Sequence, residues 1–273
     1  MKRNNTQRKR NVSRKRNVSR KRSEVSRKRG SKKIIDVPFS RKKHLGTKAT
    51  FNNINYIYQD VFNIIKIFTK LREKGELQDV LFFNTPTNCL LKIDIINKKV
   101  ITPHMSIYNF KNELKKLIKK SSRFIPINIM AELGLNEYGD DMGNHANSII
   151  IDKNSKTIEF FEPHGYKKKF STPSDHVSVY LAKYNILKEF LKKIIPKYKL
   201  VNASDVLKKR VFQRKYDSGT GYCVIWSTLF IHYRILNPDV PIIELMDHID
   251  KTINVNKLLK YAKYTEDLLK NKI

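Results

Sequence analysis

Cysteine, acidic residues and long apolar runs are scarce in this chain, and each shortage excludes a class of protein. The two cysteines, Cys89 and Cys223, are too few for a disulfide framework or a paired-cysteine zinc site, so we expect no metal and no cofactor. No run approaches about eighteen apolar residues, and the N-terminus lacks an apolar stretch, which argues against a membrane span and a secretory signal. These absences favour an intracellular protein.

Acidic residues number 25 against 56 lysines and arginines, which gives a formal net charge of +31. The excess is concentrated in residues 1–49, where twenty basic and two acidic residues carry +18 of the total. A segment with so much like charge and so little apolar content cannot bury a core. We therefore predict a disordered basic arm over residues 1–49, followed by a folded domain over residues 50–273 that is itself basic.

The arm contains a repeat. The string Arg-Lys-Arg-Asn-Val-Ser at residues 8–13 recurs at residues 14–19 and, more loosely, at residues 20–26 and 27–31. Such runs bind nucleic acid, direct nuclear import or do both, and the alternative is a solvated tail with no partner. No aromatic residue interrupts the repeats, so binding would be non-specific and sensitive to salt. The expected phosphate contacts are the basic residues of the repeats: Arg8, Lys9, Arg10, Arg14, Lys15, Arg16, Arg20, Lys21, Arg22, Arg27, Lys28 and Arg29.

The remainder of the chain mixes helical and strand patterns, which predicts an α+β domain. Apolar periodicity favours helices over the residue ranges 61–71, 107–118, 177–195, 242–249 and 256–269. Strands are expected over residues 80–83, 89–96, 124–129 and 199–202. Pro126 should place the strand 124–129 at an edge of its sheet, because proline cannot donate to a neighbouring strand. Cys89 lies in a dense apolar strand and is interpreted as a core residue.

Cys223 begins a helical pattern directly after Gly219 and Gly221. Trp226, Phe230 and Tyr233 follow it at i+3, i+7 and i+10. In the first turn of a buried helix the macrodipole and the free N–H groups favour the thiolate, as a nucleophile requires. The alternative is a small apolar side chain that packs beside Trp226.

Two apolar runs upstream predict an antiparallel hairpin, one over residues 144–152 and one over residues 156–163. We expect His145, at the start of the first strand, to lie opposite Glu162 at the end of the second. A carboxylate holds a histidine in one tautomer and makes it a better base. His164 is close to Glu162 in sequence and competes with His145 for this role.

The order His145, Glu162, Cys223 resembles that of the cysteine proteases that process ubiquitin-like modifiers, and of their adenoviral relatives. Uncharacterised proteins of large DNA viruses share the strings Phe-Glu-Pro-His-Gly and Gly-Tyr-Cys-x-x-Trp-Ser, which occur here at residues 161–165 and 221–227. The resemblance covers roughly residues 100–250. It implies a papain-like fold of the SUMO-protease and adenoviral-protease type, a mixed sheet flanked by helices. It also implies a Cys-His-Glu triad and a glutamine that stabilises the oxyanion.

Four positions depart from the family pattern. Ala146 stands where the family usually has tryptophan, and Val224 where it has glycine. Glu162 replaces the more frequent aspartate. Gln213 lies ten residues before Cys223, whereas the family's glutamine lies about six before its cysteine. Either the loop is longer and Gln213 still reaches the oxyanion, or another donor serves beside the Cys223 backbone N–H.

Two functions remain open at this point. The first is a thiol peptidase with Cys223 as nucleophile, His145 as base, Glu162 as orienting acid and Gln213 as oxyanion donor, acting on a protein substrate. The second is a non-enzymatic virion or nucleic-acid-binding protein that keeps a protease-like fold. In a virus the expected locations are the virion and the host cytoplasm or nucleus.

Overall fold

The computed structural model describes residues 33–41, 61–83, 89–132, 144–163, 176–206 and 222–270. Contacts divide the chain at residue 34, and residues 35–273 form the unit that contains all helices and strands of the described ranges. In those ranges, no helix is both long and apolar enough to span a membrane.

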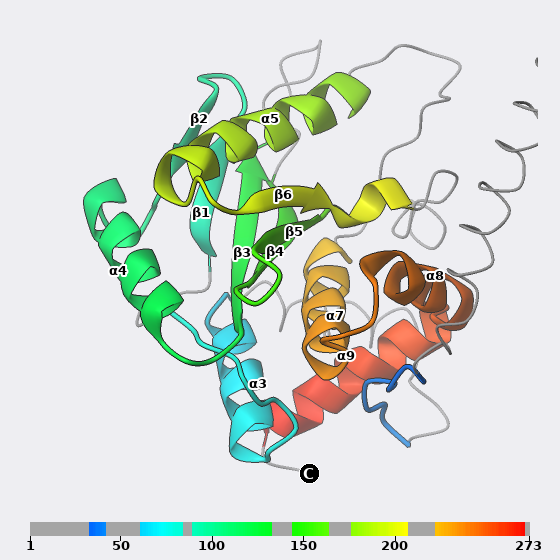
Figure 1. The fold of residues 1–273 in the computed structure, drawn as a ribbon. Coiled ribbons are helices and arrows are strands. Elements are labelled where there is room, and N and C mark those ends of the chain that lie inside the picture. The colour runs from blue at the N-terminus through cyan, green and yellow to red at the C-terminus, as the bar shows by residue number, and fades with distance from the viewer. Residues whose placement is uncertain are drawn as a thin grey trace, which may run out of the picture. The chain divides into compact units, whose positions relative to one another are not determined.

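Six strands of the described residues form one mixed sheet in the order β2-β1-β3-β4-β5-β6 (Figure 1). The neighbours β1–β3 and β5–β6 are parallel, and the other neighbours are antiparallel. The strands are β1 (Cys89–Asp94), β2 (Lys99–Ile101), β3 (Phe124–Glu132), β4 (Asn144–Asp152), β5 (Thr157–Phe161) and β6 (Lys199–Asn202). The sequence-based predictions of an α+β mixed sheet and of the β4–β5 hairpin are confirmed.

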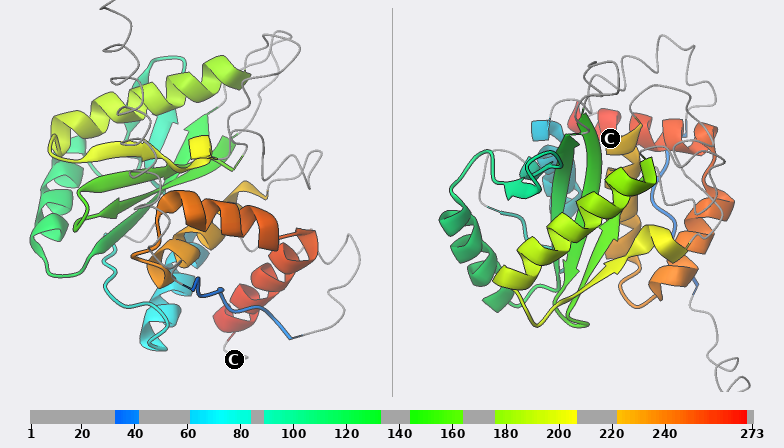
Figure 2. Two further views of the ribbon diagram at one scale, coloured as in Figure 1. Left: turned by 45° about the vertical axis from the view of Figure 1, so that its right-hand side comes forward. Right: turned by 90° about the horizontal axis from the view of Figure 1, so that it is seen from above.

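Helices cover both faces of this sheet (Figure 2). α4 and α5 pack on one face, and α7 packs on the other, against β4. α9 contacts α3 and α7, while α8 contacts the short 3-10 helix η1. Their bounds are α3 (Val61–Glu73), α4 (Ile107–Lys119), α5 (His176–Ile194), η1 (Ala203–Val206), α7 (Cys223–Leu236), α8 (Ile242–Thr252) and α9 (Val255–Leu269). Each helix expected from the apolar periodicity is therefore confirmed.

Strand β5 shows how the central strands use both faces. Ile158 and Phe160 belong to the core that α4 and α5 close. Phe161 points the other way and stacks on Phe230 of α7, with ring centroids 4.5 Å apart. Because helices cover both faces, the central strands can be apolar along their length rather than alternating with polar residues.

Strand β3 lies in the interior of the sheet, between β1 and β4, so the prediction that Pro126 marks an edge is wrong. The Phe124 N–H donates to the Asp79 carbonyl, and the Leu81 N–H donates to the Phe124 carbonyl, each at 2.8 Å and on the side away from β4. Alternate residues of a strand direct their backbone groups the same way, so the Pro126 nitrogen faces that side too. β1 begins to pair at Asn128, so among the described residues no ladder bond needs the hydrogen that proline lacks.

The strand predicted over residues 80–83 is present in the described residues only as a single bridge between Val80 and Phe124. Strand β1 ends at Asp94, two residues earlier than predicted. The Asp94 carboxylate accepts the Asn97 backbone N–H at 2.9 Å and the Asn97 side-chain amide at 2.8 Å, which turns the chain toward β2.

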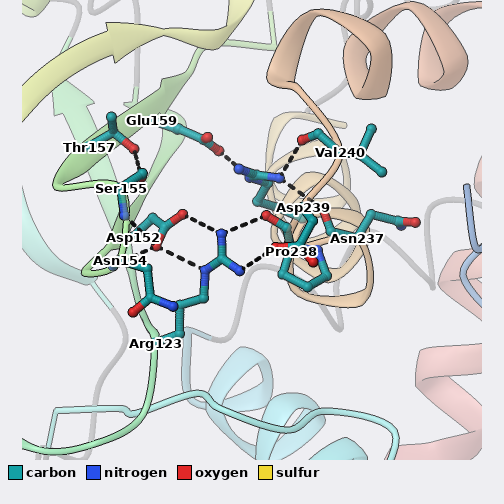
Figure 3. A network of polar contacts seen from close by, with 11 residues as sticks. Arg123, Asp152, Asn154, Ser155, Thr157, Glu159, Asn237, Pro238, Asp239 and Val240 are labelled. Atoms are coloured by element: carbon teal, nitrogen blue, oxygen red, sulfur yellow. Dashed lines mark hydrogen bonds and ion pairs between the residues drawn. The ribbon is translucent and has the colours of Figure 1, made fainter. Parts of the chain in front are cut away.

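Two arginines bind the C-terminal end of α7 to the hairpin (Figure 3). Arg123 contacts the carboxylates of Asp152 and Asp239, at 2.9 and 2.8 Å. Arg234 of α7 reaches the Glu159 carboxylate of β5 at 2.7 Å, and both side chains are buried. Charge-assisted bonds of this kind fix the position of α7 relative to the hairpin.

Residues 35–41, part of the stretch assigned to the arm from its charge, make contacts within the folded unit. The Ile35 N–H donates to the Asn237 side chain at 2.7 Å, and the Tyr233 hydroxyl donates to Asp36 at 2.9 Å. Val37 is buried. The domain boundary at residue 49 stays a prediction, because residues 1–32 and 42–60 lie outside the described residues.

Candidate active site

Cys223 is the first residue of α7 and is 7% exposed. The preceding residue, Tyr222, makes no side-chain cap bond to the first turn of the helix. The backbone N–H of Ala146 in β4 donates to the Cys223 sulfur at 3.5 Å. Donors and the positive end of the helix dipole stabilise negative charge on this sulfur.

His145 lies in β4 between Cys223 and Glu162. Its Nε2 meets Glu162 Oε1 in a short contact, and the ring also forms a hydrogen bond with the Cys223 thiol. Because Nε2 is engaged by the carboxylate, Nδ1 is the nitrogen left for the sulfur. The structure therefore brings the predicted nucleophile, base and acid together, although α7 lies far from the β4–β5 hairpin in sequence.

The His145–Glu162 pair is diagonal rather than directly opposite. In the observed register Ser148 faces Phe161, so continuing the ladder by one residue would set Glu162 opposite Asn147. His145 lies two residues beyond Asn147 on the same side, a diagonal separation that a long side chain can span. The prediction that His145 lies directly opposite Glu162 is therefore wrong by two residues, although the two side chains are in contact.

Two residues that contact Glu162 were not singled out from the sequence. Ser204 of η1 accepts the Glu162 backbone N–H at 3.0 Å and donates its hydroxyl to the Glu162 carbonyl at 2.9 Å. Lys183 of α5 donates to Glu162 Oε2 at 2.5 Å. A signal for Lys183 existed, because it precedes Leu187 and Leu191 at i+4 and i+8 and so occupies the apolar stripe of its helix. No comparable pattern distinguishes Ser204.

The site favours a thiolate–imidazolium pair. Burial lowers the pKa of His145, but the Glu162 charge and the hydrogen bonds to Cys223 and Glu162 outweigh burial and raise it to about 9. Burial raises the pKa of the Cys223 thiol, but the hydrogen bond and charge of His145 and the Ala146 N–H outweigh it, so the thiol pKa is lowered. A pair with these shifts holds the proton on the ring and leaves the sulfur nucleophilic.

Several predicted site residues lie outside the described residues. They include Gln213, the competing base His164, and all twelve basic residues of the repeats. The oxyanion role of Gln213 and the phosphate contacts of the arm therefore stay predictions. Within the described ranges, no group of three or more His, Cys, Asp or Glu side chains is arranged to hold a metal ion.

No protein-family model matches the chain, and no curated protein matches it. Among solved structures it is similar to ChlaDub1 of Chlamydia trachomatis at 14% identity and a TM-score of 0.43, over 77% of this chain and 90% of that one. The SUMO protease Ulp1 matches at 16% identity and a TM-score of 0.38, over 85% and 90%. The pS273R protease of ASFV matches at 14% identity and a TM-score of 0.31, over 54% and 45%. Identities and TM-scores this low do not identify catalytic residues, so the assignment of the candidate active site rests on the positions of Cys223, His145 and Glu162 in this structure.

Proposed function

We propose that the protein is a thiol peptidase that cleaves peptide or isopeptide bonds through Cys223, His145 and Glu162. The observation that carries this proposal is the hydrogen-bonded series from the Cys223 sulfur through the His145 ring to the Glu162 carboxylate. A structural cysteine needs only apolar neighbours, whereas this thiol meets a base that is itself oriented by an acid.

In the proposed reaction the Cys223 sulfur attacks the substrate carbonyl, and a tetrahedral oxyanion forms. His145 then gives its proton to the leaving amine, the C–N bond breaks and an acyl-thioester remains on the sulfur. The neutral His145 next takes a proton from water, which attacks the thioester and releases the acid and Cys223. Glu162 keeps the ring oriented, and the backbone N–H of Cys223 is one donor for the oxyanion.

This proposal predicts that Cys223 reacts with iodoacetamide at a lower pH than an ordinary cysteine. The lowered thiol pKa places the acid midpoint of the reaction below that of an ordinary cysteine, because the thiolate is the reacting species. Peptidase activity should rise through the same midpoint and fall again near pH 9, where His145 loses the proton that the leaving amine needs.

The measurement is the rate of modification of each cysteine against pH, with the modified peptides identified by mass spectrometry. The same protein unfolded in urea is the control, because both cysteines then titrate as ordinary thiols. If native Cys223 shows the unfolded midpoint, or if a peptidyl vinyl sulfone labels it no faster than Cys89, the peptidase proposal fails. The non-enzymatic alternative would then stand.

For the substrate, we favour a nucleic-acid-associated protein that is cut during virion maturation over a ubiquitin-like modifier. The small side chain of Ala146 stands where the modifier-processing proteases usually have tryptophan, which weakens the case for tight recognition of a diglycine tail. A basic arm would hold the enzyme near substrates that are bound to nucleic acid, and so raise their local concentration.

The arm should bind duplex DNA with little sequence preference and a steep salt dependence. If about eight of its basic residues each neutralise a phosphate, log K should fall with log salt at a slope near −7, at roughly 0.9 per contact. Deleting residues 1–32 removes all four repeats and leaves residues 35–41 in their contacts within the folded unit. Cleavage of a short free peptide should survive this deletion, while cleavage of a DNA-bound protein should decrease.

The measurement is a salt titration of duplex binding by the full-length protein and by the protein that lacks residues 1–32. Equal affinities and equal slopes would contradict a role for the arm. Any binding would then belong to the basic surface of the remaining chain.

A further inference from the structure

Lys183 is the one buried lysine of the described residues. Its side chain is 4% exposed, and its Nζ lies 2.5 Å from Glu162 Oε2, while the other oxygen of the same carboxylate meets His145. A buried ammonium group costs several kcal/mol unless it is paired, so the pairing with Glu162 is the contact that makes this position tolerable.

We propose that Lys183 is a positioning residue of the active site, which keeps the Glu162 carboxylate ionised and turns its Oε1 toward His145. This inference rests on the proposed peptidase function and adds a fourth residue to the triad. The ammonium group touches neither the sulfur nor the reacting carbonyl in this scheme, so it acts through Glu162 alone.

The charges of the site support this role. Among the described residues, four titratable groups meet here: Cys223 from α7, His145 from β4, Glu162 after β5 and Lys183 from α5. With a thiolate, an imidazolium, a carboxylate and an ammonium, the charges of these four groups sum to zero. Removing Lys183 takes a positive charge from beside the buried Glu162 carboxylate, which disfavours a second negative charge on the Cys223 sulfur.

Packing alone does not account for a lysine at this position. α5 is already held to the sheet by Leu187 and Leu191 in the core, and the Tyr184 hydroxyl donates to the Leu200 carbonyl at 3.2 Å. An apolar side chain of similar length would continue the stripe that these leucines form. The position instead holds a charged group, and that group pairs with the Glu162 carboxylate.

The test is the pH dependence of Cys223 alkylation in K183M, with K188M as the matched control on the exposed side of the same helix. K183M should move the acid midpoint upward by about one pH unit or more, the usual effect of losing a close opposite charge. Two routes give this direction. If Glu162 takes a proton, the thiolate loses a stable imidazolium partner. If Glu162 stays ionised without the ammonium group beside it, its negative charge opposes the thiolate more strongly.

A double-variant comparison separates positioning from stability. In E162Q the carboxylate through which Lys183 acts is absent, so E162Q and E162Q/K183M should share one midpoint. E162Q leaves the Lys183 charge without its carboxylate partner, whereas E162Q/K183M removes both charges of the pair, so the double variant is expected to fold even if K183M alone does not. Thermal unfolding of each variant shows which ones are folded at the assay temperature.

The outcomes are distinguishable. A wild-type midpoint equal to that of the urea-unfolded chain contradicts the peptidase proposal itself. If the wild-type midpoint is lowered and folded K183M has the same midpoint, the role of Lys183 is contradicted while the peptidase proposal stands. An upward shift of about one pH unit from E162Q to E162Q/K183M also contradicts the role of Lys183. A shift in K183M that is absent in K188M and absent in the E162Q background supports it.

Discussion

Cys223→Ala should reduce peptide cleavage by about 10⁴-fold or more, because no other group can form the acyl-thioester. His145→Ala should have a loss of similar size, since the base and the nucleophile act as a unit. Glu162→Ala is expected to reduce activity less, because an acid that orients the base contributes less than the base itself. It should also lower stability, since Lys183 would keep its buried charge without its carboxylate partner.

The measurement is kcat/KM on a substrate that the wild-type protein cleaves, with Cys89→Ala as the matched cysteine control. Thermal unfolding of Cys223→Ala should differ little from wild type, because the change removes only one small atom group at the start of a helix. Full activity in Cys223→Ala would refute its role as nucleophile.

Glu159→Ala should lower the free energy of unfolding by about 3 kcal/mol or more, the usual cost of breaking a buried ion pair from one side. Arg234 would keep its bonds to the carbonyls of Asn237 and Val240 but lose the carboxylate that balances its charge. Because this pair binds α7 to β5 (Figure 3), the variant should also loosen the contact between Cys223 and His145 and slow alkylation near neutral pH.

Denaturant unfolding of Glu159→Ala beside Asp247→Ala provides the comparison. Asp247 pairs with Lys251 on the exposed side of α8, at 2.5 Å, and exposed pairs of this kind contribute little to stability. Equal losses in the two variants would show that the Glu159–Arg234 pair is no more important than a surface contact.

Local patterns in the sequence were enough to predict the elements that carry the triad. The glycines before Cys223 and the apolar spacing after it predicted α7, and the two apolar runs around a polar turn predicted the β4–β5 hairpin. These features depend on residues close together in the chain, because helix and strand periods are set by the backbone itself. The resemblance to the protease family then predicted that the hairpin and the helix lie together in one active site.

The tertiary structure decided the features that depend on distant partners. Pro126 is accommodated inside the sheet because its nitrogen faces a position where none of the described residues pairs, and this depends on where β1 begins. His145 reaches Glu162 diagonally because the register of β4 and β5 is set by the core on both faces. Lys183 occupies an apolar stripe, yet only the packing of α5 against β5 shows that its partner is Glu162. Periodicity tells which face of a helix is buried, but the group that a buried charge meets is fixed only when separate elements pack together.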